Sequence, residues 1–237
     1  MKQLIREIFE CNLCSNIAFE RTFYYNNLSP EIGILMQNPA FPSKKEKSEL
    51  QKAITYEEQI QVHVKYLRKW IVKSGHFFIP FFSLLKQKGL VSYDELENYI
   101  HSGKYLSDFY FFDAVKCRSA TKDIKAEHFN NCSRFVEREL ELLSNIEIIF
   151  SFSSRTWEHF KEKFNPKLVK KDFHLNNTKV SSAHGHLFSI LYKNRIIYVI
   201  PLVHMSEKIF NNLLRNSYFD YLEEGLDELA SIKVNIK

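Results

Sequence analysis

The chain has 237 residues, of which 45% are hydrophobic and 26% are charged. This length fits one substantial domain, and this composition allows a packed core and excludes general disorder. The formal net charge of +5 is compatible with a polyanionic partner but does not by itself indicate one. The longest apolar run, FFIPFFSLL at 77–85, is short and contains a proline, so we expect no membrane span. The N-terminus lacks the apolar core of a secretory signal, and we therefore expect a cytosolic protein.

The N-terminal half of the sequence is mainly helical in pattern. Residues 2–10 carry apolar side chains at helical spacing, and EIGILMQNPAFP (31–42) is a short buried-strand pattern that stops at Asn-Pro. Residues 43–74 place apolar side chains at helical intervals in a charged sequence, which predicts one or two amphipathic helices. Further helices are predicted over 77–88 and 92–103.

The C-terminal half alternates strands with helices. Three apolar runs rich in β-branched or aromatic residues, at 108–115, 146–152 and 195–203, are typical of strands that are covered on both faces. Helical periodicity over 126–144 separates the first two, and this alternation predicts an α/β fold with a parallel sheet between helices. No linker or repeat divides the chain, so we expect a single domain over 1–237.

The spacing of the four cysteines indicates a metal site. Cys11 and Cys14 form a C-x2-C pair, and Cys117 and Cys132 follow much later in the chain. Disulfides are not expected, because cytosolic reductants keep thiols reduced. A C-x2-C turn lets two thiolates converge on one metal, and two further cysteines would complete the ligands of a zinc ion or a 4Fe-4S cluster. Four unconnected buried cysteines are the alternative.

Polar residues follow three of the predicted strands: MQNPA (36–40), DAVKC (113–117) and VHMS (203–206). Taken singly, each motif is weak, because an Asn-Pro turn is usually only a turn and a strand-end histidine is more often structural. An aspartate near lysine and arginine is often only salt-bridged. In parallel sheets, however, ligands bind beyond the carboxyl ends of the strands, so these three turns define the candidate site.

In this order, and together with the cysteines, the motifs resemble the uracil-DNA glycosylase superfamily, specifically its iron–sulfur branch. That branch pairs an N-terminal C-x2-C with Asn-Val-Val-Lys-Cys-Arg, a helix-opening cysteine and a final His-Pro-Ser. Here CNLC, DAVKCRSA, FNNC and VHMS occupy these places. The resemblance covers 11–214, with helical insertions near 43–74 and 92–103. It implies a three-layer α/β/α fold around a mainly parallel four-stranded sheet, a DNA partner and a monomer. The implied ligands of a 4Fe-4S cluster, with zinc as the alternative, are Cys11, Cys14, Cys117 and Cys132.

The resemblance assigns catalysis to two strand ends. The implied reaction is hydrolysis of an N-glycosidic bond, in which the sugar becomes oxocarbenium-like as the base leaves. Asn38 falls where one group of the superfamily has a water-activating aspartate and another has asparagine, so its carbonyl would orient the water. His204 falls on the histidine of the last motif and would stabilise the charge that develops on O2 of a departing pyrimidine. Met205 replaces the proline of that motif.

The remaining assignments concern DNA. By the same resemblance Phe77 falls near the ring on which the flipped base stacks, with its neighbours Phe78, Phe81 and Phe82 as competitors. The residues that we expect beside the sugar and phosphates, or in the loop that enters the DNA, are Gln37, Pro39, Lys116, Arg118, Ser206, Lys208 and Phe210.

Asp113 takes the place of a family asparagine that reads uracil. A carboxylate offers only acceptors, so O4 of uracil would face an oxygen, at a cost on the order of 1–3 kcal/mol in a buried pocket. Cytosine instead presents an N4 amino donor, which aspartate accepts well. Removal of plain cytosine would destroy the genome, so we expect a cytosine modified at C5, such as glucosylated 5-hydroxymethylcytosine in phage DNA.

Three alternatives stay open at the level of sequence. One is plain uracil or mismatch repair, with Asp113 serving only structure. Another is a non-catalytic protein that binds DNA or abasic sites, since both the first and the last motif are altered. The third is a zinc- or cluster-stabilised protein that shares only the fold.

Overall fold

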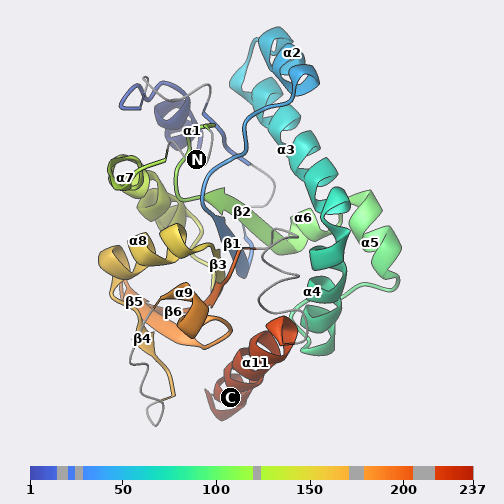
Figure 1. Cartoon of the computed structure of the whole chain (residues 1–237), viewed down its shortest axis with the longest axis vertical. Coiled ribbons are helices and arrows are strands. Elements are labelled where there is room, and N and C mark those ends of the chain that lie inside the picture. The colour runs from blue at the N-terminus through green and yellow to red at the C-terminus, as the bar shows by residue number, and fades with distance from the viewer. Residues whose placement is uncertain (15–20, 25–28, 120–123, 171–178, 205–216, 237) are drawn as a thin grey trace.

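A computed structural model describes residues 1–14, 21–24, 29–119, 124–170, 179–204 and 217–236 (Figure 1). Its helices are α1 (Lys2–Phe9), α2 (Lys44–Lys52), α3 (Tyr56–Lys73), α4 (Gly75–Gln87), α5 (Leu96–Ser102), α6 (Tyr105–Asp108), α7 (Ala126–Leu142), α8 (Ser154–Phe164), α9 (Val180–Ala183) and α11 (Tyr218–Ile236). Its strands are β1 (Ile32–Met36), β2 (Phe109–Asp113), β3 (Ile148–Phe152), β4 (Lys167–Leu168), β5 (Phe188–Tyr192) and β6 (Arg195–Leu202). None of these helices is long and apolar enough to cross a membrane.

The strands form one sheet in the order β2-β1-β3-β6-β5-β4. The first four are parallel to one another, and β5 and β4 extend the sheet in antiparallel orientation. The four parallel strands are those predicted from the sequence, and the α/β class with a mainly parallel sheet is confirmed. The prediction missed β5 and β4, because β5 is buried only at alternate positions and β4 has two residues, so neither gives a continuous apolar run.

Helices cover both faces of the sheet, which gives three layers (Figure 1). On one side, α7 packs against α8, which contacts β3 and β5. On the other side, α4 contacts α3, α5 and α11. Buried apolar residues from Leu4 to Leu229 form one contiguous core. The strands β1, β2 and β3 are buried on both faces, which explains why they appear in the sequence as unbroken apolar runs.

The charged segment 43–74 folds as the two helices α2 and α3. A capping box begins α3: the Thr55 hydroxyl accepts from the Glu58 backbone N–H at 3.2 Å, and the Glu58 carboxylate accepts from the Thr55 N–H at 3.0 Å. The helix predicted over 92–103 begins only at Leu96, and it ends at Gly103, whose φ of 77° favours glycine.

The carboxyl end of β6 is held by His184, which follows α9. Its Nδ1 accepts from the Val203 N–H at 3.2 Å, and its Nε2 donates to the Tyr218 carbonyl at 3.1 Å. Burial lowers the pKa of His184 to about 4, so the ring is neutral and has one accepting and one donating nitrogen. The Tyr218 hydroxyl donates to the Val203 carbonyl at 2.8 Å. These bonds fix the residue that precedes His204.

Gly225 allows α11 to lie against this turn, because a Cβ there would overlap the carbonyl oxygen of Gly185. We expect Gly225→Ala to lower the free energy of unfolding by about 3 kcal/mol, as overpacking does, in urea denaturation. Gly75→Ala is the matched control, since its Cβ would meet only the flexible side chain of Ile79. That helical substitution should be neutral or stabilise by about 0.5–1 kcal/mol. Equal effects of the two substitutions would contradict this close contact.

Candidate active site

The carboxyl ends of the parallel strands lie side by side at one edge of the sheet. Asn38 follows β1, Asp113 ends β2, and His204 follows β6. Met36 pairs in register with Asp113, and the Ala114 N–H donates to the Met36 carbonyl at 2.8 Å. This edge is where ligands bind in sheets of this kind.

A cavity of about 580 Å³ opens at this edge, a volume typical of small-molecule sites. The strand ends form one wall, and α2 and α3 form another. Its lining residues are Tyr24, Met36, Gln37, Asn38, Pro39, Ala40, Phe41, Ser43, Glu46, His63, Tyr66, Leu67, Lys69, Trp70, Lys73, Asp113, Arg118, Phe152 and His204. The structure therefore brings together the predicted residues Asn38, Asp113 and His204, and also Gln37, Pro39 and Arg118.

Asn38 is oriented by hydrogen bonds on both sides of its amide. Its Nδ2 donates to the carbonyl of Pro39 at 2.9 Å and to that of Ser119 at 3.2 Å. Its Oδ1 accepts from Nε2 of Gln37 at 3.2 Å. A carbonyl oxygen has two lone pairs, so Oδ1 retains an acceptor site for a water or ligand. The amide nitrogen is held against the backbone, and the carbonyl is the group that can act.

Gln37 is in turn held by Ser153, which the sequence analysis did not single out. The Ser153 hydroxyl lies 3.3 Å from Oε1 of Gln37, to which it donates, and it accepts from the Thr156 N–H at 3.3 Å, which caps α8. Ser153 has φ 86° and ψ 153°, a conformation that residues other than glycine rarely adopt. Such strain persists where the surroundings enforce it and is common at functional sites. The small-residue turn FSFSS was the only signal in the sequence.

Asp113 is a buried carboxyl group that is 1% exposed. Neither of its oxygens makes a well-aligned hydrogen bond within the described part of the chain, although the Tyr24 hydroxyl lies close enough to lower its pKa. Burial raises its pKa to about 7, opposed by the positive charge of Lys116. Burial and the negative charge of Asp113 also raise the pKa of Tyr24, which lines the same cavity. Near neutral pH, Asp113 is thus divided between a carboxylate and an acid that can both donate and accept.

His204 lines the cavity on the side opposite β2, after the end of β6. Although His204 is exposed, desolvation by the surrounding atoms lowers the pKa of its imidazole below the ordinary value, which favours the neutral ring at pH 7. A neutral imidazole carries one N–H donor and one acceptor. This side chain can therefore donate a hydrogen bond to an oxygen that gains negative charge.

Phe77 does not lie in the cavity wall, contrary to its predicted stacking role. It is fully buried on α4, where it stacks on Phe81 with ring centroids 5.3 Å apart and meets Phe152 edge-on at 5.5 Å. The rings that do line the cavity include Phe152, Tyr66 and Trp70, none of which the sequence analysis assigned. The phenylalanine rings of α4 belong to the hydrophobic core, because that helix packs them toward the sheet.

Lys116 is likewise not available for phosphate. It is 2% exposed and forms an ion pair with Glu139 on α7, whose other oxygen accepts from the Tyr110 hydroxyl at 3.0 Å. A buried lysine needs such a partner, because an unpaired charge in the core is costly. The predicted phosphate contact of Lys116 therefore has no support from the structure, and this lysine lies in the core between β2 and α7.

Arg118 reaches the cavity, but its guanidinium braces the wall. One nitrogen lies 2.7 Å from the carboxylate of Glu46 on α2 and 3.0 Å from Nδ1 of His63 on α3, and Nε donates to the Ala40 carbonyl at 3.1 Å. Burial lowers the pKa of His63 to about 3, so its neutral ring accepts from the guanidinium. The side chain is 6% exposed, which leaves the predicted phosphate contact without support. The predicted DNA contacts Ser206, Lys208 and Phe210 lie outside the described residues.

The four cysteines are free thiols, and Cys14, Cys117 and Cys132 are buried. Cys117 hydrogen-bonds to Cys132, which lowers the pKa of Cys132, and Cys14 is close enough to interact with both. Sulfur atoms also accept from the Lys116 N–H at 3.5 Å, from Asn131 Nδ2 at 3.7 Å and from Arg134 at 3.8 Å. Within the described ranges, no group of three or more cysteine, histidine or acidic side chains is arranged to hold a metal ion.

The buried carboxyl of Asp113 should make stability depend on pH. Its pKa in the folded protein, about 7, lies above the ordinary value of 3.8, so stability falls as pH rises between these values. Relative to the wild type, Asp113→Asn should gain up to about 1.4 kcal/mol of unfolding free energy per pH unit in this window. Lys116, Arg118 and Glu139 are present in both proteins. Urea denaturation of both from pH 4 to pH 8 measures the difference, and a flat difference would contradict the raised pKa.

Comparison with known proteins agrees with this geometry. A comparison with curated proteins finds no match. The family model described as the uracil DNA glycosylase superfamily matches residues 72–229, two thirds of the chain. The match runs from the end of α3 into α11 and includes Asp113 and His204, whereas Asn38 and the C-x2-C pair precede it. The chain therefore belongs to the uracil DNA glycosylase superfamily, a family of DNA glycosylases that hydrolyse N-glycosidic bonds in DNA.

Proposed function

We propose that this protein removes a modified cytosine from DNA and leaves an abasic site. The observation that carries the proposal is the buried carboxyl of Asp113, which faces the cavity at the place where the family reads the base and has only the nearby Tyr24 hydroxyl, without a well-aligned hydrogen bond, among the described residues. An unsatisfied buried polar group is costly, and a ligand that completes its hydrogen bonds removes that cost.

The protonation of Asp113 decides which bases it complements. Cytosine presents an acceptor at N3 beside a donor at N4, and a carboxylic acid answers both by donating from one oxygen and accepting at the other. Since N3 of cytosine is itself basic, this pair keeps both hydrogen bonds whichever partner carries the proton. If the protonated carboxyl group is rotated so that its two oxygens exchange places, it donates to O4 of uracil and accepts from N3–H, whereas the carboxylate repels O4. Because the pKa of Asp113 is about 7, part of the population is protonated at neutral pH and can accept uracil. The preference for cytosine is therefore weaker than that of a permanent carboxylate, and uracil is the second candidate substrate.

Asn38 positions the attacking water. Its Nδ2 is held by two backbone carbonyls and its Oδ1 by Gln37, so the remaining lone pair of Oδ1 points in a fixed direction. An amide is no strong base, but the oxocarbenium-like sugar needs little proton removal before attack. Positioning alone therefore supplies the catalysis.

His204 stabilises the leaving base. As a neutral donor, it gives a hydrogen bond that strengthens as negative charge builds on O2 of the pyrimidine. The bonds from His184 and Tyr218 to Val203 hold the backbone next to it, so the attachment point of the donor is fixed before the substrate arrives. Preorganised donors of this kind are effective because they need no rearrangement during the reaction.

The walls contributed by α2 and α3 favour a base with a substituent. The volume of about 580 Å³ exceeds what a pyrimidine ring fills, and Tyr66, Trp70 and Glu46 bring apolar and polar groups to the added space. A group at C5 would extend away from the Watson–Crick edge that Asp113 reads. Such a requirement would protect plain cytosine, and it fits a role against phage DNA that carries glucosylated 5-hydroxymethylcytosine.

We further propose that the four cysteines hold a 4Fe-4S cluster, with zinc as the alternative. The donor set is chemically suitable, since all four are thiols, and N–H groups of Lys116, Asn131 and Arg134 already point at sulfur atoms. When bound, the cluster would serve as a structural tie between α1, the turn after β2, and α7. Hydrolysis of the base requires no electron transfer.

The substrate is tested with duplexes and single strands that carry uracil, cytosine, 5-hydroxymethylcytosine or its glucosylated form, followed by cleavage at abasic sites. We expect release of a modified cytosine and retention of plain cytosine. Release of uracil alone would refute the cytosine proposal. Binding of DNA without release of any base would instead favour the non-catalytic alternative.

Asn38→Ala should reduce base release at least about 100-fold, because the water loses its position, while DNA binding persists. Asn98→Ala, an exposed substitution on α5, is the matched control and should leave the rate unchanged. A wild-type rate in Asn38→Ala would remove Asn38 from the mechanism.

Asp113→Asn, assayed on the same panel, should move the preference toward uracil, and an unaltered preference would exclude Asp113 from base reading.

The metal is tested on protein purified without oxygen. A 4Fe-4S cluster gives a brown protein that contains iron and acid-labile sulfide, and Cys14→Ser should lose both. Colourless protein with bound zinc would support the alternative. Protein with neither metal would refute the proposed site.

A further inference from the structure

The C-terminal half of α3 carries a row of positive charges. Lys65, Lys69 and Lys73 are spaced by four residues, which places them on one side of the helix about 6 Å apart along its axis. All three are exposed, and the acidic residues of this helix, Glu57 and Glu58, lie in its first turn. The row is therefore a one-signed surface rather than a mixed, solvated helix face.

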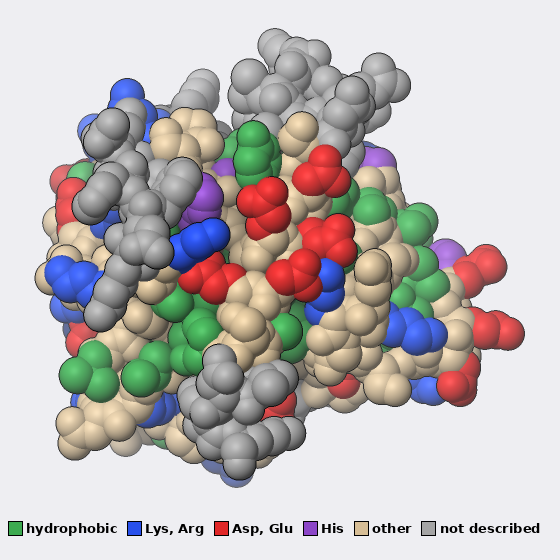
Figure 2. Space-filling view, turned by 90° about the horizontal axis from the view of Figure 1, so that it is seen from below, with side chains coloured by type: hydrophobic (Ala, Val, Ile, Leu, Met, Phe, Trp, Pro, Cys, Tyr) green, Lys and Arg blue, Asp and Glu red, His purple; other side chains and the backbone are tan. Residues whose placement is uncertain are grey.

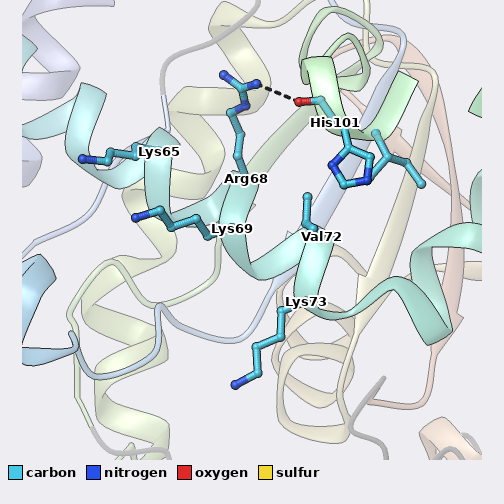
Figure 3. Close-up of a pocket in the computed structure, with 7 residues that line it drawn as sticks. Lys65, Arg68, Lys69, Val72, Lys73 and His101 are labelled. Carbon is cyan, nitrogen blue, oxygen red and sulfur yellow. Dashed lines mark hydrogen bonds between the residues drawn. The ribbon is translucent and has the colours of Figure 1, made fainter. Parts of the chain in front are cut away.

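Two cavities meet at this row. A second cavity of about 440 Å³ lies between α3 and α5 and is lined by Lys65, Arg68, Lys69, Val72, Lys73, Ile100 and His101 (Figure 3). Lys69 and Lys73 line both this cavity and the candidate active site. They therefore stand on the rim of the base cavity, and we call these two residues the lysine ridge.

The other cations of the second cavity already have partners. Lys65 lies 2.7 Å from the carboxylate of Glu49. The guanidinium of Arg68 donates to the carbonyl of His101 at 3.2 Å (Figure 3) and to that of Ser102 at 2.9 Å. These contacts join α3 to α2 and α5.

The lysine ridge differs from these cations. No acidic side chain in the described part of the chain lies within ion-pairing distance of Lys69 or Lys73. Lys69 acts on Glu49 only at longer range, and its ammonium lies 4.4 Å from the ring centroid of Tyr66. Two ammonium groups without close counterions at the lip of a cavity attract an anion.

We propose that the lysine ridge binds the phosphodiester backbone of the DNA strand beside the extruded nucleotide. This inference rests on the proposed function, because it uses the same cavity for the base. The same helix supplies Tyr66 and Trp70 to that cavity, and alternating rings and ammonium groups are the features with which proteins bind nucleotide chains. Lys69 precedes the segment matched by the family, and Lys73 lies at its very start, so the family match itself assigns no role to this stretch of α3.

The charge distribution over the rest of the molecule agrees with this assignment. The helix α11 carries five acidic residues and one lysine. Acidic side chains gather near the centre of the face seen from below, at the end of the molecule where α11 lies (Figure 2). The net charge of +5 is therefore unevenly distributed, with acidic side chains on α11 and basic side chains on α3. This distribution would direct a polyanion toward α3.

The test is the salt dependence of binding to a fluorescent oligonucleotide with unmodified bases, followed by anisotropy. In Lys69→Gln/Lys73→Gln, the slope of log K against log salt should fall by about 0.9 per lysine on duplex DNA, or about 0.7 on a single strand. Lys167→Gln/Lys193→Gln removes the same charge in the edge strand β4 and in the turn between β5 and β6, and should keep the wild-type slope. Thermal unfolding of both variants checks that the fold is intact, since Lys73 also stabilises the C-terminus of α3.

A wild-type slope in the ridge variant, or an equal loss in the control, would overturn the inference. Its failure can be told from that of the proposed function by the base-release assay. Loss of slope in a protein that releases no base would keep the ridge and refute the glycosylase proposal. Base release together with an unchanged slope in the ridge variant would support the glycosylase proposal and refute the role of the lysine ridge. A wild-type protein that does not bind DNA would refute both.

Discussion

The buried guanidinium of Arg118 is the interaction on which the cavity depends. It joins four pieces that are distant in sequence: the turn after β2, the loop after β1, Glu46 of α2 and His63 of α3. Removal of one partner of such a buried pair typically costs about 3–5 kcal/mol, because the other charge is left unpaired. The segment 43–74 is thereby tied to the strand ends, in addition to the contacts that α3 makes with α1, α4 and α5.

Two buried carboxyl groups near β2, those of Glu139 and Asp113, differ in the partners that the structure gives them. Glu139 receives Lys116 and the Tyr110 hydroxyl, so its charge is matched inside the core. Asp113 forms no ion pair and no well-aligned hydrogen bond among the described residues, although the Tyr24 hydroxyl lies near it and the same lysine lies three positions away in the sequence. The acid at the cavity therefore keeps acceptor capacity that the acid in the core does not. This contrast within one structure supports a role in base reading better than the raised pKa alone.

The parallel strands and the residues at their ends could be predicted because both leave local signals. A strand buried on both faces is an unbroken apolar run, and a polar residue directly after it must lie at the carboxyl edge. The roles of Phe77 and Lys116 could not be predicted in this way. The sequence HFFIPFF does not show which rings face the sheet, and Lys-Cys-Arg looks the same whether its charges meet phosphate or a buried acid. The deciding partners, Glu139 and Glu46, are distant in sequence, and only the tertiary structure brings them together.

The cysteine region and the base cavity are mechanically connected, which gives the proposed cluster a consequence for the site. Phe9, at the end of the helix before the C-x2-C pair, stacks on Tyr56 with centroids 5.0 Å apart and on His63 at 6.3 Å. His63 contacts Arg118, so α1 covers the brace that positions α2 and α3. A metal that ties α1 to α7 would hold this cover in place and keep water from the buried ion pair. A cluster bound there would thus act on the cavity through structure alone, by maintaining the wall formed by α2 and α3.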